Sequence, residues 1–86
     1  MISKKASIDE SVKLGHYVFI EDDVEIGFGT VVKQFVEIKE GAKIGKNCII
    51  SSHVVIEEGV EIKDNTGIEE FSHVKENIGP GLFGGK

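Results

Sequence analysis

Three histidines are the side chains of this sequence best suited to exchange protons near neutral pH: His16, His53 and His73. An imidazole has an ordinary pKa close to neutrality, so it can serve as a general base. The single thiol, Cys48, has no second cysteine with which to form a disulfide. We expect no metal site, because no spacing of histidine, aspartate or glutamate marks a ligand set. What the histidines can do therefore depends on the elements that position them.

A six-residue repeat accounts for nearly every position from Ile8 to Ile78. The unit from Ile44 to Ile49 shows its form, with an aliphatic residue first, a turn-prone Asn47 fourth and the small Cys48 fifth. The fifth positions are small or β-branched throughout, so Cys48 is expected to fill the core. The first positions are all aliphatic: Ile8, Leu14, Ile20, Ile26, Val32, Ile38, Ile44, Ile50, Ile56, Ile62, Ile68 and Val74. A fixed short period of this kind is typical of a solenoid.

Each repeat predicts one very short strand followed by a turn. Positions five, six and the next position one alternate in direction, so the outer two point inward. The fourth positions are often Gly, Asn or Asp, which adopt positive φ at low cost. An amphipathic helix would need apolar residues at spacings of three and four, which a period of six does not supply. The chain is therefore expected to be all-β, with strands that must stack on their neighbours.

This pattern resembles the repeat of the hexapeptide-repeat proteins. The resemblance implies a left-handed parallel β-helix of about four triangular coils, eighteen residues each, with no helical domain. We expect residues 1–7 to form an N-terminal lead-in, residues 8–79 the β-helix and residues 80–86 a glycine-rich C-terminal tail.

Stacking by eighteen residues predicts one aromatic corner and one acidic corner. The first would carry Tyr17, Phe35, His53 and Phe71 in one column, with exposed apolar residues on both sides. Such a column either stabilises the coils by stacking or is buried against a partner, because large apolar patches are rarely left in water. The opposite corner, expected to face solvent, carries Glu21, Asp22, Asp23, Glu40, Glu57, Glu58 and Glu76, with Lys39 and Lys75.

In hexapeptide proteins a corner like the aromatic one typically faces a threefold axis, so the resemblance implies a homotrimer. The residues expected at the interface between subunits are Tyr17, Phe19, Val31, Phe35, Ile49, His53, Val55, Phe71 and His73.

Local stretches resemble the amino-sugar N-acetyltransferases: EGAKIGKNCII (40–50), GVEIKDN (59–65) and NIGPGLF (77–83). The resemblance implies acyl transfer from coenzyme A or an acyl carrier protein to a small-molecule acceptor such as a sugar or amino sugar. Acetyl-CoA would be a co-substrate, and no permanently bound cofactor is expected. His53 and His73, at or beside the subunit boundary, are the candidate catalytic bases. The alternative hypothesis is a non-catalytic trimeric scaffold or interaction module.

The charge balance restricts the partners. The formal net charge of −5 argues against binding to nucleic acid or to an anionic membrane surface, since both would repel the chain. Residues 1–5 are followed by no apolar stretch of signal-peptide length, so we expect a cytoplasmic location.

Overall fold

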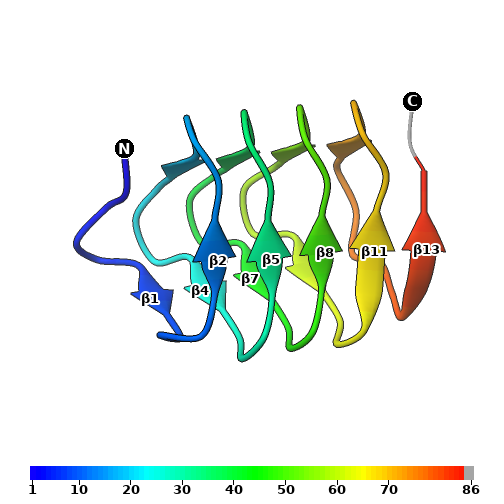
Figure 1. Cartoon of the computed structure of the whole chain (residues 1–86), viewed down its shortest axis with the longest axis horizontal. Helices are drawn as coiled ribbons and strands as arrows, with labels where there is room; N and C mark the ends of the chain where they lie inside the picture. Colours follow the sequence, from blue (N-terminus) through cyan, green and yellow to red (C-terminus); the bar gives the residue numbers. More distant parts are fainter. Residues whose placement is uncertain (85–86) are drawn as a thin grey trace.

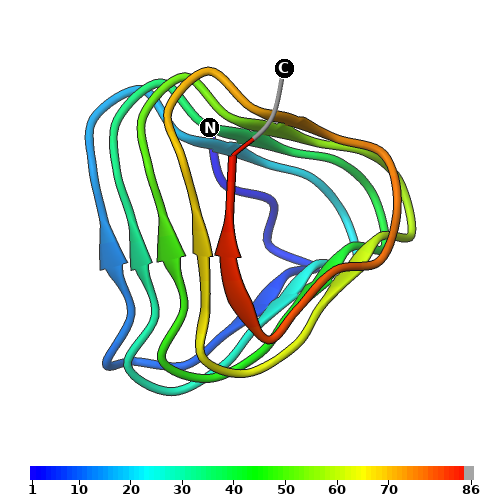
Figure 2. The same ribbon diagram turned by 90° about the vertical axis from the view of Figure 1, so that its right-hand side faces the viewer.

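The computed structural model describes residues 1–84, whose strands form three parallel sheets. The sheets are the three faces of a triangular prism, and the chain visits them in turn (Figures 1 and 2). Face 1 contains β1 (Ser7–Ile8), β4 (Glu25–Ile26), β7 (Lys43–Ile44) and β10 (Glu61–Ile62). Face 2 contains β2 (Lys13–Leu14), β5 (Val31–Val32), β8 (Ile49–Ile50), β11 (Thr66–Ile68) and β13 (Gly81–Phe83). Face 3 contains β3 (Phe19–Ile20), β6 (Glu37–Ile38), β9 (Val55–Ile56) and β12 (His73–Val74).

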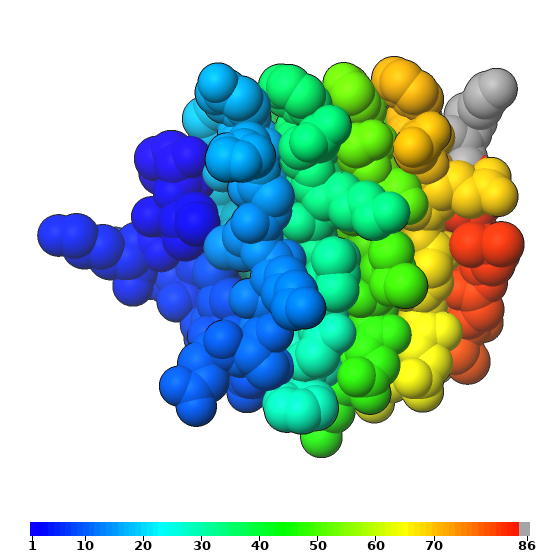
Figure 3. Space-filling model, in the orientation of Figure 1, coloured from blue at the N-terminus to red at the C-terminus, as the bar shows by residue number. Residues whose placement is uncertain are grey.

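The coil is left-handed. In Figure 2 the chain runs clockwise while it advances toward the viewer from the blue N-terminal end to the red C-terminal end. The space-filling view shows the coils as successive bands along the long axis (Figure 3). The expected fold, a parallel β-helix of about four triangular coils, is confirmed.

The register between coils explains how such short strands are stable. Ile8 pairs with Ile26 and Ile26 with Ile44, so equivalent positions lie one above the other at a separation of eighteen residues. The first position of each repeat points inward, and Ile20, Ile38 and Ile56 form one fully buried column. Each strand thus gains ladder hydrogen bonds and apolar burial only through the coils beside it.

The corners hold the residues that the repeat places fourth. Asn47 and Asn65 have φ values of 55° and 61°, and Gly41 has 76°. Asn and Gly adopt this left-handed region more readily than other residues, because Gly lacks a Cβ and the Asn side chain can hydrogen-bond locally. After each corner, the side chain at the fifth position points into the core again.

A polar column lies inside the corner between faces 1 and 2. The hydroxyl of Thr30 donates a hydrogen bond to the Gly45 carbonyl at 2.8 Å and accepts one from the Cys48 amide at 3.1 Å. The Cys48 thiol donates to the Lys63 carbonyl at 3.1 Å. Cys48 is fully buried, as expected for core filler, and burial raises the pKa of its thiol.

Backbone β-pairing continues into the segments before and after the repeat. In the expected lead-in, Ile2 forms a parallel bridge with Ile20. In the expected tail, residues 81–83 form β13, which pairs with β11 and adds a strand to face 2. The last two residues of that tail, 85–86, lie outside the described residues. Across residues 1–84, the structure contains no helix with the length and apolarity that a membrane crossing requires.

Candidate functional site

The aromatic column lies at the corner between faces 2 and 3, as expected. Tyr17 stacks on Phe35 with ring centroids 5.2 Å apart, Phe35 on His53 at 5.0 Å, and His53 on Phe71 at 4.7 Å. The ring planes differ by only 7° to 23°, so the rings cover one another's faces and present their edges outward. Tyr17, Phe35 and Phe71 remain 47% to 69% exposed.

This column is built on an unfavourable backbone conformation. All four of its residues have φ between 59° and 64°, the region in which Asn47 and Gly41 lie at other corners. A bulky L-residue costs roughly 1–2 kcal/mol there. Aromatic stacking contributes about 0.5–1.5 kcal/mol per pair, which offsets part of that cost within the chain. The aromatic corner thus carries a backbone cost that glycine or asparagine would reduce.

His53 and His73 lie in different environments. The imidazole of His53 stacks between Phe35 and Phe71 within the aromatic column. His73 begins β12 on face 3, and its side chain is 47% exposed. The structure therefore places the two predicted bases on adjacent columns, and His73 is hydrogen-bonded to a carboxylate.

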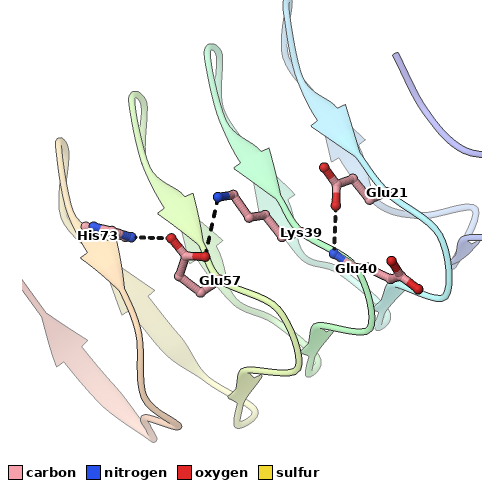
Figure 4. Close-up of polar contacts among 5 residues, drawn as sticks. All are labelled: Glu21, Lys39, Glu40, Glu57 and His73. Atoms are coloured by element: carbon pink, nitrogen blue, oxygen red, sulfur yellow. Dashed lines mark hydrogen bonds and ion pairs between the residues drawn. The ribbon is translucent and has the colours of Figure 1, made fainter.

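His73 belongs to a chain of polar contacts that crosses face 3 (Figure 4). Its Nε2 lies 2.5 Å from Oε2 of Glu57, and the other carboxylate oxygen of Glu57 lies 3.4 Å from Nζ of Lys39. Residues of three successive coils are thereby linked. Neighbouring Glu21 accepts a hydrogen bond from the Glu40 amide at 3.0 Å.

The electrostatics of this contact favour an ionised Glu57. The hydrogen bond from His73, followed by that from Lys39, holds the pKa of the Glu57 carboxyl below its ordinary value. The same carboxylate raises the pKa of Lys39. Because an ionised carboxylate only accepts hydrogen bonds, Nε2 of His73 is the donor, and Nδ1 of a neutral His73 is then the nitrogen that can accept a proton.

The sequence interpretation placed Glu57 on a solvated acidic face and did not connect it with His73. The repeat does contain the signal for this pairing. Val55 is the register partner of His73, and Glu57 lies two residues after Val55, on the same face. A glutamate side chain at that place can reach the strand above, but the rotamer that achieves this is fixed only by the folded structure.

Two hollows adjoin these residues. An open depression of about 340 Å³ is lined by His73, Lys75 and Glu76 together with the apolar Ile68 and Phe83. A second hollow, of about 380 Å³, runs beside the aromatic column and is lined by Tyr17, Phe19, Phe35, Val36, Glu37 and Val55.

The remaining residues expected at an interface lie on the two faces that meet at the aromatic corner. Val31 and Ile49 pair on face 2, where both side chains point outward. Phe19 and Val55 begin β3 and β9 on face 3. Among the residues that the structure describes, no group of three or more His, Cys, Asp and Glu side chains is placed to hold a metal ion.

Comparisons with known proteins agree with this geometry. The model of the family described as bacterial transferase hexapeptide (six repeats) matches residues 23–58 and 41–76. No curated protein sequence matches the chain.

Solved structures with the same fold include the Arabidopsis UDP-N-acetylglucosamine acyltransferase, with a TM-score of 0.55 and 15% identity over 86% of this chain and 29% of that one. Another is the H141A mutant of GDP-perosamine N-acetyl transferase from Caulobacter crescentus, in complex with CoA and GDP-perosamine. It has a TM-score of 0.54 and 19% identity over 90% of this chain and 48% of that one. The present chain spans less than half the length of either protein.

Proposed function

The chain belongs to the bacterial transferase hexapeptide (six repeats) family, and from this premise we propose that it transfers an acyl group from a coenzyme A thioester to a sugar or amino-sugar acceptor. The single observation that carries this proposal is the 2.5 Å contact between His73 and Glu57 on an exposed face. A solved structure with this fold binds CoA and a nucleotide-linked amino sugar, which supports the choice of donor and acceptor. We further propose that the chain acts as a cytoplasmic homotrimer.

In the proposed reaction, Nδ1 of His73 removes a proton from the acceptor hydroxyl or amine as its oxygen or nitrogen attacks the thioester carbonyl. The tetrahedral intermediate collapses with cleavage of the C–S bond, and the thiolate takes up the proton that His73 removed, so that free coenzyme A leaves and the neutral imidazole is restored. Glu57 holds the ring through Nε2 and stabilises the imidazolium that forms, while Lys39 holds the second carboxylate oxygen. His73 is therefore the catalytic residue, and Glu57 and Lys39 are positioning residues.

This assignment separates the two histidines that the sequence left as alternatives. Both histidines are exposed, and they differ in that the ring of His73 is oriented through Nε2 by Glu57, which leaves Nδ1 to approach the acceptor. His53 instead continues an aromatic stack, in which a phenyl ring would fill the same place.

The test combines binding with turnover. Acetyl-CoA at millimolar concentration should raise the melting temperature, because a ligand that binds the folded state stabilises it. With a panel of amino-sugar acceptors, release of free thiol should fall by roughly 10²–10⁴-fold in His73→Ala, since this is the usual contribution of a general base. His53→Phe should retain turnover. Absence of both a melting shift and thiol release would refute the proposal.

The second candidate function is a non-catalytic trimeric scaffold, which the aromatic corner favours. Four side chains kept in a costly backbone conformation, three of them 47% to 69% exposed, indicate a surface maintained for association. A chain that self-associates but neither binds acetyl-CoA nor releases thiol would have this function.

A further inference from the structure

The apolar core behind face 3 is covered at the N-terminal end of the prism and open at the C-terminal end. Its inward column consists of Ile20, Ile38, Ile56 and Val74. Ile2 forms a parallel bridge with Ile20 and covers the first end of this column. Among residues 1–84, no strand pairs with the outer edge of β12, so Val74 ends the column without a strand above it. The column is therefore open at the edge of β12.

The other two faces are covered at this end. Ile78 forms a parallel bridge with Ile62 on face 1, and β13 pairs with β11 on face 2. The exposed fractions agree, since the three isoleucines of the face 3 column are 0% exposed, whereas Val74, at 7%, is the most exposed of the buried hydrophobic residues that the structure describes. The opening is the depression of about 340 Å³ lined by His73, which we call the C-terminal hollow. Its lining residues belong to the end of the prism that faces the viewer in Figure 2.

The C-terminal hollow has an apolar floor and a polar margin. The residues of the floor are Ile68, Val74, Ile78 and Phe83, which all pack against the core. The margin is formed by the exposed residues His73, Lys75 and Glu76. A ligand that fits this arrangement has an apolar chain that lies on the floor and a polar group that lies beside His73.

Two backbone N–H groups point along the same margin. In the coil below, the amides of Val55 and Glu57 each donate a hydrogen bond of 3.0 Å to a carbonyl of the last coil. His73 and Lys75 lie one coil above these two residues, so their amides point in the same direction. Within residues 1–84, no strand lies above β12 to accept them. They can therefore donate to a carbonyl oxygen of a ligand and stabilise negative charge that develops there.

We propose that the C-terminal hollow holds the acyl group of the donor, with the thioester carbonyl at the amides of His73 and Lys75 and the carbon chain on the apolar floor. The inference rests on the transferase function proposed above and specifies its acyl group as an unbranched chain of about six carbons. A methylene group is close in size to a water molecule, which takes ~30 Å³, so a six-carbon chain fills roughly half of the hollow and leaves space for the thioester. An acetyl group would leave the floor in contact with water. All residues of this subsite belong to one chain.

The first measurement is the affinity for a series of donors. Calorimetry with the acetyl, butanoyl, pentanoyl, hexanoyl, octanoyl and decanoyl thioesters of coenzyme A gives Kd for each chain length. Thiol release with an amino-sugar acceptor gives kcat/KM for the same donors. We expect Kd to fall about two- to fourfold with each added methylene as far as hexanoyl, because each methylene is removed from water. Decanoyl should gain nothing over octanoyl, since the end of its chain lies outside the hollow.

Two variants change the size of the hollow, and the readout is the shortest chain that reaches the lowest Kd. Val74→Ile adds a methyl group to the floor and carries the side chain found at the three lower members of its column. We expect the preferred chain to shorten by about one carbon in this variant. Phe83→Ala removes a ring from the floor, and the preferred chain should lengthen by about two carbons or more.

Leu82→Ala is the matched control for Phe83→Ala. Leu82 precedes Phe83 in β13, is 73% exposed and does not line the hollow, so its replacement should leave the preferred chain unchanged. Urea denaturation of all four proteins checks that a change in preference is not a loss of folding.

The outcomes separate the subsite from the transferase function. Equal Kd values from acetyl to octanoyl, together with thiol release, would overturn the subsite and leave the function in place. A preference for hexanoyl that Val74→Ile and Phe83→Ala both leave unchanged would also overturn it, because the chain would then lie on another surface, such as the aromatic column. A preference that shifts as expected, without thiol release from any donor, would support the subsite and refute the transferase function. Absence of binding by every donor would refute both.

Discussion

The imidazole of His73 shares a hydrogen bond with Glu57 on an open face, whereas that of His53 lies between two aromatic rings. The same side chain is therefore suited to proton transfer at one position and to packing at the other. The difference arises from the repeat: His53 occupies a fourth position, at a corner, and His73 a sixth position, on a strand.

Replacing His53 with alanine isolates the stacking contribution. Alanine has a Cβ and therefore carries the backbone cost of the positive φ as other non-glycine residues do, so the variant removes the ring and leaves that cost in place. We expect His53→Ala to lose about 1–3 kcal/mol of unfolding free energy from two lost stacks, measured by urea denaturation. His53→Phe, which retains both stacks, should match the wild type. Equal stability of all three proteins would show that the stack contributes nothing.

Glu57 makes stability depend on pH. Because its folded-state pKa lies below the ordinary value, the ionised carboxylate stabilises the fold above that ordinary value, and the contribution is lost as the pH falls through the folded-state pKa. The melting temperature of the wild type should therefore exceed that of Glu57→Gln near neutral pH, and the gap should close on acidification.

The matched control for this prediction is Glu58→Gln, which changes the adjacent exposed carboxylate. Its melting temperature should follow the wild-type curve at every pH. A gap between wild type and Glu57→Gln that stays constant down to about pH 3, well below the ordinary carboxyl pKa, would contradict the assigned role of the ionised form.

At the scale of the repeat, two glycines are required for different reasons. Gly59 has a φ of +70° with open space around its missing side chain, so alanine there would suffer only backbone strain. A Cβ on Gly45, which has no positive φ, would lie 2.7 Å from the backbone nitrogen of Asp64 in the next coil. We expect Gly59→Ala to cost about 1 kcal/mol and Gly45→Ala about 3 kcal/mol, measured by urea denaturation. Equal losses would mean that the coils can separate to accept the methyl group.

The repeat, together with the resemblance to the hexapeptide-repeat proteins, was sufficient to predict the architecture, the inward columns and the aromatic column. The period of six identifies the inward positions, and the eighteen-residue coil that the resemblance implies makes Tyr17 and Phe35 neighbours in space. Composition at the first and fifth positions likewise fixes the core, including buried Cys48.

Other features depend on geometry that no period specifies. The His73–Glu57 contact needs one particular glutamate rotamer, and the Gly45 requirement arises from the backbone of the coil above. The strand at residues 81–83 follows a break in the hexad pattern, so it could not be read from the repeat. Sequence reasoning therefore identified which residues stack above one another, but it missed contacts between residues of different columns, such as that of His73 with Glu57.

At the scale of the whole molecule, the apolar and charged surfaces are separated. The corner between faces 3 and 1 carries the ionised contacts of Glu57 and Lys39, while the aromatic corner carries exposed rings. In a chain with a net charge of −5, contacts between acidic surfaces are repulsive, so we expect the proposed self-association to use the apolar corner.

Removing rings from the aromatic corner should therefore remove association without removing the fold. In Phe35→Asn/Phe71→Asn the new residues tolerate positive φ, so the coil persists while two exposed rings are lost. By sedimentation at micromolar concentration we expect the wild type at a multiple of its 9.4 kDa chain mass and this variant at the chain mass itself. Phe28→Asn is the control, since Phe28 is 57% exposed at the corner between faces 1 and 2 and should leave assembly unchanged. A double variant that assembles as the wild type does would locate the interface elsewhere on the prism.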